Sequence, residues 1–565
     1  MSKQPNSRRS GSSAASKSRN KVSSPRNSKR REKQSIGRFD SQECLSQTND
    51  YSWYSNFPQF TKDAGTIAFG VPLGNPIALD QKDNFAVPGL IRLSFYPTIG
   101  YSKDLSSPIN RSAVRFYTYL RNIQKAAARY DSADIMMYLM ALDSCYMFHS
   151  MLRRAYGIAQ LYTPINKYYP KRMFQMMGFD PSIMDNLAEF RAYINRFAIS
   201  LGSYTVPGNI DMFNRHQWMC EGMYLDSNTT RAQTYFFVPE GFWQFNNTVT
   251  TGSELDFVPW LPQTQGVGEA QIQLHTLAQI QDIGNSLINA ILNDQDTGDI
   301  SGDIYAAFGA TGTKKLVETS EDFMILPVYD EVVLSQIENA TIVGKAWNVE
   351  RQPEKGYMFK ISQDPMVNNG AILFQPAFLG SGGNLGTSAK PLYYNVAINR
   401  GNGLINMHND HPTPEQVIEA TRLMVIGEDV YTSGHLNGSS FVSSRIGADV
   451  VSSMLLGVLN PTTGALSSLA IFTNGIYNPS DAVVAAGDGT SSSIDVQSMA
   501  LLSNFDFHPL RWVWNAGDDW STNVVANVTQ VQGDIDNLTT VSGQQLSVMH
   551  EAVLLSLFDV PQMGM

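Results

Sequence analysis

Cysteine is scarce in this sequence, and its cysteines are never paired along the chain. The three cysteines, Cys44, Cys145 and Cys220, lie far apart and form no Cys-x-x-Cys motif. Small secreted domains depend on dense sets of cysteines, and structural zinc sites need closely spaced pairs. The sequence therefore predicts no disulfide framework, and we expect a reducing, intracellular compartment.

Long, uninterrupted apolar runs are also missing. The first 38 residues contain no apolar core of signal-peptide length, and they lack the apolar face that a mitochondrial presequence needs. The most apolar stretch is "IMMYLMALDSCYMFHSMLRRAYG", which runs from Ile135 to Gly157. Asp143, His149 and two arginines interrupt it before about 20 clean residues accumulate. We expect a buried helix there and no membrane span.

Motifs of catalysis and metal binding are absent or incomplete. The sequence has no Gly-x-Ser-x-Gly elbow and no His-Glu-x-x-His. "NDQDTGDISGD" places Asp294 and Asp296 as in an EF-hand loop, but Tyr305 stands where the last glutamate of such a loop belongs. "HNDHP" brings together His408 and His411 without a third ligand nearby. We expect no enzyme, no metal site and no cofactor, although a Ser/His/Asp constellation assembled in space stays open.

Aromatic and acidic residues are nearly missing from the first 38 residues, whereas basic ones are plentiful. This segment has no aromatic residue, one acid, eleven serines and twelve Lys or Arg, which is a formal charge of about +11. So little apolar surface cannot offset the entropy cost of ordering, and we expect a disordered basic arm over residues 1–38. The residues expected to contact phosphates are Arg8, Arg9, Lys17, Arg19, Lys21, Arg26, Lys29, Arg30, Arg31, Lys33 and Arg38.

The rest of the chain has the opposite charge. Residues 39–565 contain 29 basic and 50 acidic side chains, or −21, which leaves the whole chain at −10. An acidic body repels nucleic acid everywhere except where the arm points, so nucleic acid is the partner that we favour for the arm. A nuclear-import signal, a tether to acidic membranes and a solubilising tail stay open as alternatives.

Residues 107–130 show the clearest helical pattern. Apolar residues recur at spacings of three and four from Ala113 to Tyr130, which builds one apolar face. The opposite face carries a basic ridge with no acid among its members: Arg111, Arg115, Arg121, Lys125 and Arg129. One interpretation is a solvated helix paired with acids elsewhere in the body. The other is a second phosphate-facing surface.

Other elements follow from capping signals and periodicity. Asp134 is the expected cap of the apolar helix over 135–157, and Asp180 with Pro181 begins a helix that Gly202 ends. Helices are also expected near 269–292 and over 544–558. From residue 318 onward, the short runs "DFMILPVYDEVVL", "ATIVGKAW", "AILFQPAFL" and "LYYNVAI" are typical of strands.

The run "YPKRMFQMMGFDPSIMDNLAEFRAYINRFAISLGSYTVPGNIDMFNRHQWMCEGMYLDS", Tyr169 to Ser227, together with the basic arm and the chain length, resembles the capsid proteins of picobirnaviruses. These are small double-stranded RNA viruses, and partitivirus capsids are a near neighbour of the same general design. The resemblance implies homodimers that close into a small icosahedral shell around double-stranded RNA. In some members the basic arm is removed by self-cleavage, for which no residue of this sequence can be assigned.

The expected fold is mainly α with an α+β middle. The disordered basic arm occupies 1–38, and a helical shell domain begins with 39–235. A loop-rich, mixed α/β projecting or dimer-contact domain occupies 236–500, and a helical C-terminal part, 501–565, returns to the shell.

These features together predict a structural capsid protein of the virion, present in the host cytoplasm during assembly, whose partners are itself and viral RNA. The first alternative is a non-assembling RNA-binding protein with a basic tail, although the body carries no RNA-recognition, KH or zinc-finger signature. The second alternative is an enzyme with a dispensable basic tail.

Overall fold

The computed structural model describes residues 51–54, 56–67, 76–78, 84–86, 89–125, 129–161, 169–228, 232–260, 274–294, 296–341, 343, 346, 359–378, 402–429, 441–459, 466–471, 511–514, 528–532 and 536–559. The chain divides into two units, Met1–Gly70 and Val71–Met565. The first unit contains the short helices η2 (Tyr51–Trp53) and α2 (Pro58–Gly65).

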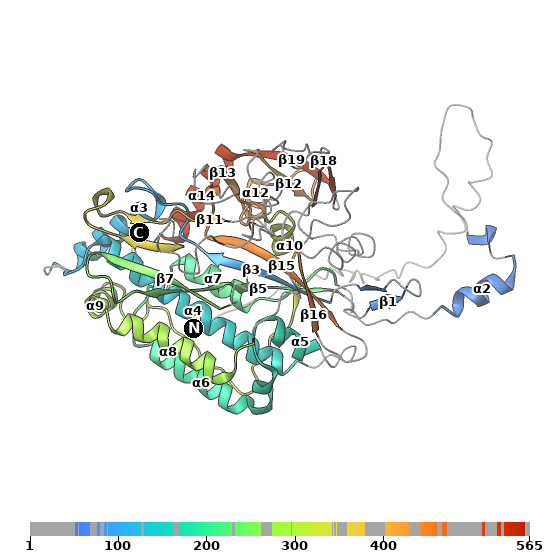
Figure 1. The fold of residues 1–565 in the computed structure, drawn as a ribbon, viewed down its shortest axis with the longest axis horizontal. Helices are drawn as coiled ribbons and strands as arrows, with labels where there is room; N and C mark the ends of the chain where they lie inside the picture. The colour runs from blue at the N-terminus through green and yellow to red at the C-terminus, as the bar shows by residue number, and fades with distance from the viewer. Residues whose placement is uncertain are drawn as a thin grey trace, which may run out of the picture. The chain divides into compact units, whose positions relative to one another are not determined.

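A six-stranded mixed sheet runs through the second unit (Figure 1). Its strand order is β16 (Leu466–Ile471), β15 (Asp449–Leu459), β3 (Leu90–Pro97), β5 (Thr234–Pro239), β4 (Tyr224–Leu225) and β8 (Val328–Tyr329). The central strand β3 pairs in parallel with β5 and antiparallel with β15. Every residue of β3 is buried, as expected for a strand that is covered on both faces.

This sheet contains strands from different segments of the expected domain division. β3 lies within 39–235, which was expected to be helical, whereas its neighbour β15 lies within 236–500. One hydrophobic core holds buried residues from Leu90 to Phe558. The segments 39–235, 236–500 and 501–565 therefore share one core. Strands buried on both faces lose the alternating pattern that identifies a strand, which is why the sequence pattern did not reveal β3.

The long helix α4 (Ser132–Ala159) is the element around which other helices pack. Its side chains are buried almost all round, as its sequence predicts. The N-cap is Asp131, whose side chain accepts hydrogen bonds from the backbone N–H groups of Ala133 (2.8 Å) and Asp134 (3.2 Å). Asp134, the predicted cap, instead accepts from the Asp131 N–H at 2.8 Å and completes a capping box.

The helices in contact with α4 are α3 (Pro108–Ile123), α5 (Tyr169–Met176), α6 (Leu187–Leu201), α7 (Asp211–Glu221), α8 (Leu277–Leu292) and α9 (Thr297–Phe308). They confirm the helices predicted within 107–130, 181–201 and 269–292. Three boundaries differ from the prediction. α8 begins at Leu277 and not near residue 269. α3 ends at Ile123, and a 3-10 helix, η3 (Pro181–Asn186), precedes α6. Asp180 caps η3 and Asn186 caps α6.

Smaller sheets complete the described fold. An antiparallel sheet of β10 (Ile372–Leu373), β9 (Lys360–Gln363), β7 (Ser253–Pro259) and β6 (Gly241–Phe245) packs on α4, and η5 (Asn368–Gly370) connects β9 to β10. The remaining pairings are β1 (Pro76–Ala78) with β2 (Asn84–Ala86), β17 (Arg511–Trp514) with β18 (Val528–Gln532), and β14 (Phe441–Arg445) between β11 (Ala377–Phe378) and β13 (Ile426–Asp429).

A second, smaller core lies among elements of the C-terminal half. Strands β12 (Asn402–Met407) and β19 (Asn537–Ser542) pair there, beside α12 (Pro414–Ala420) and α14 (Gly543–Leu557). The buried members are Ile405, Met407, Ala420, Met424, Ile426, Val541 and Leu546. α14 confirms the helix predicted over 544–558.

The strand-like runs predicted after residue 318 are only partly strands. "DFMILPVYDEVVL" contains β8, but its end belongs to the helix α10 (Glu331–Glu338), which Asp330 caps. "AILFQPAFL" contains β10 and β11. No described residue of "ATIVGKAW" belongs to a named strand, and "LYYNVAI" lies outside the described residues.

Candidate functional site

The basic residues of the arm, from Arg8 to Arg38, lie outside the described residues. Their role as phosphate contacts stays a prediction from the sequence. The predicted basic ridge lies within the described part of the chain, but only Arg111, Arg115 and Arg121 belong to α3. Lys125 and Arg129 follow the end of this helix at Ile123, so the prediction that they share its face was wrong.

The N-terminal half of the ridge is joined to the C-terminal helix. Arg111 Nη1 lies 2.5 Å from Glu551 Oε1 of α14, and Arg115 Nη2 lies 3.1 Å from Asp559 Oδ1, just after α14. All four side chains are about half exposed. Each of these ion pairs therefore contributes little to stability, about 0–1 kcal/mol.

The C-terminal half of the ridge faces α9. Arg121 forms an ion pair with Asp303 and donates to the Tyr130 hydroxyl at 2.8 Å, and that hydroxyl donates to Asp303 Oδ2 at 2.5 Å. Arg129, which is 82% exposed, lies 3.7 Å from Asp299. Lys125 is exposed.

The ridge is therefore not a bare cationic surface, because its four arginines lie beside carboxylates of α9 and the α14 region. This arrangement matches the interpretation of a solvated helix paired with acids of the body. The sequence could not choose between the two interpretations, since these acids are 170 or more residues away along the chain. Lys125 and Arg129 remain accessible to a phosphate.

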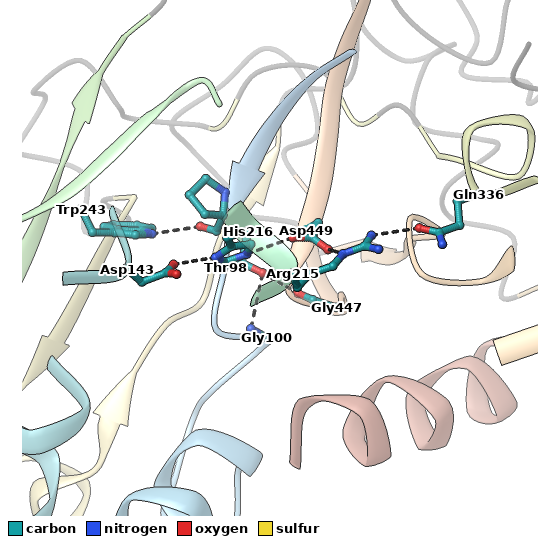
Figure 2. Close-up of polar contacts among 10 residues, drawn as sticks. Thr98, Gly100, Asp143, Arg215, His216, Trp243, Gln336, Gly447 and Asp449 are labelled. Atoms are coloured by element: carbon teal, nitrogen blue, oxygen red, sulfur yellow. Dashed lines mark hydrogen bonds and ion pairs between the residues drawn. The ribbon is translucent and has the colours of Figure 1, made fainter. Parts of the chain in front are cut away.

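A charged network lies inside the protein, where α7, α4 and β15 meet (Figure 2). His216 of α7 donates from Nδ1 to Asp143 Oδ2 of α4 at 2.5 Å and from Nε2 to Asp449 Oδ1 of β15 at 3.0 Å. The three side chains are 0%, 2% and 4% exposed. This network joins residues that the sequence separates by 73 and 233 positions.

Arg215 extends the network toward α10. Its Nε donates to the second oxygen of Asp449 at 3.0 Å, and its Nη2 donates to Gln336 Oε1 at 3.0 Å. The guanidinium also lies 4.9 Å from the centroid of the Trp218 ring. Four elements, α4, α7, α10 and β15, are thus connected by one chain of hydrogen bonds (Figure 2).

The same region fixes the end of β3. The Thr98 hydroxyl donates to the Gly447 carbonyl at 2.5 Å, and the Trp243 indole N–H donates to the Pro97 carbonyl at 2.9 Å (Figure 2). Because Gly447 lies just before β15, the bond from Thr98 joins the end of β3 to the start of β15.

The charges of the network stabilise each other. Burial lowers the pKa of His216, but Asp143 and Asp449 outweigh it and raise the pKa to about 10. Burial raises the pKa of Asp449, but Arg215 and His216 outweigh it and lower the pKa to about 2. Burial raises the pKa of Asp143 despite the nearby His216. At neutral pH, a protonated His216 therefore lies between Asp143 and the carboxylate of Asp449.

This arrangement suits structural support better than catalysis. Both ring nitrogens of His216 donate to carboxylates, so neither is available to accept a proton from a substrate. The site is also closed to solvent. The only signal in the sequence was Asp143, an acid within an apolar helix, since a buried charge requires a partner. Its partners cannot be identified by spacing.

The other candidates from the sequence have local roles. Among the described residues, no three His, Cys, Asp or Glu side chains form a group that could hold a metal ion. His408 of "HNDHP" lies between carboxylates, with Nε2 2.9 Å from Glu338 Oε2 and Nδ1 2.6 Å from Asp536 Oδ2. Among the described helices, α4 is long and apolar enough to cross a membrane, but its most apolar window is entirely buried within the protein.

Comparisons with known proteins agree with one another. The family described as picobirnavirus capsid protein matches residues 53–458. The capsid protein precursor of human picobirnavirus (strain Human/Thailand/Hy005102/-) is 32% identical over 537 residues, which cover 91% of this chain and 92% of that protein. The X-ray structure of the picobirnavirus capsid matches with a TM-score of 0.72 and 23% identity, over 90% of this chain and 98% of that one. At this identity the structural match shows a shared fold.

Proposed function

Because this chain belongs to the picobirnavirus capsid protein family, we propose that it assembles, as dimers, into a small closed icosahedral shell that encloses double-stranded RNA. Its role as a capsid protein implies self-association and a location in the virion. Within the proposal, the segment after residue 38 makes the contacts between copies, and assembly takes place in the host cytoplasm.

The division of charge is the observation that supports the RNA part of this proposal. The arm carries about +11 and the remaining chain −21. Phosphates release counterions when they bind Lys or Arg, and this gain does not depend on base sequence. The arm therefore contacts RNA phosphates without specificity, while the acidic body leaves the packaged RNA loosely held.

The basic ridge enters the proposal as a second, weaker RNA contact. Its arginines already lie beside carboxylates, so a phosphate would have to compete with Glu551, Asp559, Asp303 and Asp299. The most accessible charges, Lys125 and Arg129, would make this contact.

Negative-stain microscopy of the purified chain, with the ratio of absorbance at 260 and 280 nm on the same fraction, tests the proposal. We expect uniform spheres from the full-length chain and a ratio raised by RNA. A variant of residues 39–565 should still form spheres, but with a ratio near that of protein alone. Intact mass spectrometry must first establish that the arm is still attached in the full-length sample, since the related human picobirnavirus protein is named a precursor.

Three results would contradict the proposal in different ways. A small monodisperse species that binds RNA would favour the non-assembling RNA-binding protein, and a monomer with measurable turnover would favour an enzyme with a basic tail. Spheres of the 39–565 variant with an undiminished ratio would move RNA binding from the arm to the body.

A further inference from the structure

Residues 317–332 form a segment that includes β8 and the first residues of α10 and lies across the C-terminal end of α4, where several bonds fix it. The Tyr156 hydroxyl and the Gln160 side chain donate to the Glu321 carbonyl at 2.8 and 2.6 Å. The Thr319 N–H donates to Asn195 Oδ1 of α6 at 2.9 Å. Gly157 permits this close approach, because a Cβ there would lie 3.0 Å from the backbone nitrogen of Ile325. The segment is thus held against the body.

Residues 317–332 carry apolar side chains both on the face that packs against the core and on the face exposed to solvent. Phe323, Ile325 and Tyr329 pack against the core, whereas the residues between them are exposed. The exposed fractions are 70% for Val317, 49% for Met324, 64% for Leu326, 53% for Val328 and 43% for Val332. A strand-like segment that faces water alternates apolar with polar residues, so apolar residues on both sides indicate a second burial partner.

Charges of both signs surround these apolar residues. Glu318, Glu321, Asp322 and Glu331 are exposed on the segment itself, Asp330 is partly buried there, and no Lys or Arg lies within it. Basic residues come from the neighbouring helix α6, as Arg191 and Arg196. Arg191, Glu321 and Asp322 all act on the Tyr156 hydroxyl, so the opposite charges lie around one side chain. Two copies can meet through such a surface when the arginines of one copy lie opposite the acids of the other.

We propose that residues 317–332 form a contact between two copies of this chain, in which the segment meets the same segment of the second copy. The inference rests on the proposed assembly, and it adds which surface makes one of the contacts. In such a two-fold contact, each residue near the axis lies close to its own counterpart. Leu326, at the middle of the exposed apolar face, is the residue that we place near this axis.

Substitution with a charged residue tests the contact. Leu326→Asp should fold as the wild type does, because its side chain is exposed in the single chain, but particles in the microscope should fall at least ten-fold in number. Val317→Asp, at a position 70% exposed, gives an independent test of the same surface. The matched control is Val548→Asp on α14, a position 62% exposed, which should assemble as the wild type does.

Crosslinking tests the two-fold geometry directly. Leu326→Cys should give a covalent dimer with a short bifunctional maleimide, whereas Val548→Cys should give the background of the wild-type chain. Cys145 and Cys220 are buried, and Cys44 is replaced by serine in all three chains so that it adds no background.

Three results would overturn the inference. These are full assembly of both Asp variants, equal loss of assembly in Val548→Asp, and crosslinking of Leu326→Cys at the background level. A wild-type chain that forms no particles would instead refute the proposed function, so the two failures can be told apart.

Discussion

His216 shows at the residue scale how a buried charge is stabilised in this fold. The imidazolium is enclosed, and two carboxylates from distant parts of the chain outweigh its loss of hydration. Replacing one member of a buried charged network leaves the other charges without compensation, which typically costs about 3–5 kcal/mol. We therefore expect His216→Phe to lower the free energy of unfolding by roughly this amount, measured by urea titration of the unassembled chain at pH 7.

The difference in unfolding free energy between wild type and His216→Phe should depend on pH if the charge of His216 causes it. The pKa of His216 is raised from 6.5 to about 10, so its contribution is complete below pH 6.5 and is lost as the pH rises through about 10. The gap between wild type and His216→Phe should accordingly narrow between pH 7 and 10. The control is His411→Ala in an exposed loop, which should change stability by less than about 0.5 kcal/mol. A gap that does not vary with pH would mean that His216 acts through packing alone.

At the scale of elements, the close approach of α8 to α6 and α4 depends on Gly284. A Cβ there would clash with the Tyr193 hydroxyl, and it would lie 2.9 Å from a ring carbon of Phe148 and 3.0 Å from one of Phe197. Alanine favours a helix over glycine by about 1 kcal/mol, but overpacking costs about 1–3 kcal/mol. We expect Gly284→Ala to lower the melting temperature, and Tyr193→Phe to recover part of the loss in the double variant, because it removes the nearest atom.

Gly302 of α9 provides the matched control for Gly284. No atom lies within 4 Å of the position that its Cβ would occupy, so only the helix propensity changes. Gly302→Ala should stabilise the protein by about 0.4–1 kcal/mol. Opposite signs for the two substitutions would establish that packing, not propensity, decides the effect at Gly284. A stabilising Gly284→Ala would show that α8 can shift outward without cost.

Comparison of sequence and structure element by element shows what local patterns can predict. α6, α8 and α14 were predictable because each has apolar residues at helical spacing. β3 and β5 were not, since strands buried on both faces carry no alternation. The Asp143–His216–Asp449 network and the acids beside the basic ridge were out of reach for another reason. Their partners meet only in the folded chain, and no spacing rule connects them.

At the scale of the whole molecule, a basic arm on an acidic body should make the affinity for RNA depend strongly on salt concentration. Each Lys or Arg that contacts a phosphate adds roughly 0.7–0.9 to the slope of log affinity against log salt. Replacing Arg26, Lys29, Arg30, Arg31 and Lys33 by alanine should therefore lower the slope by roughly 3.5–4.5 if all five contact phosphates. The measurement is a salt titration of duplex RNA binding to the unassembled full-length chain.

The position of the lost charges decides how this experiment is interpreted. Lys125→Ala with Arg129→Ala removes two accessible charges from the body, where Arg129 already lies 3.7 Å from Asp299 of α9. This variant should change the slope by less than one, because a phosphate there replaces a carboxylate and releases few counterions. If the salt slope changes equally per charge removed from the arm and from the ridge, both surfaces bind RNA alike. The acidic body would then not confine RNA to the arm. A clear difference per charge would establish the arm as the principal RNA contact of the chain.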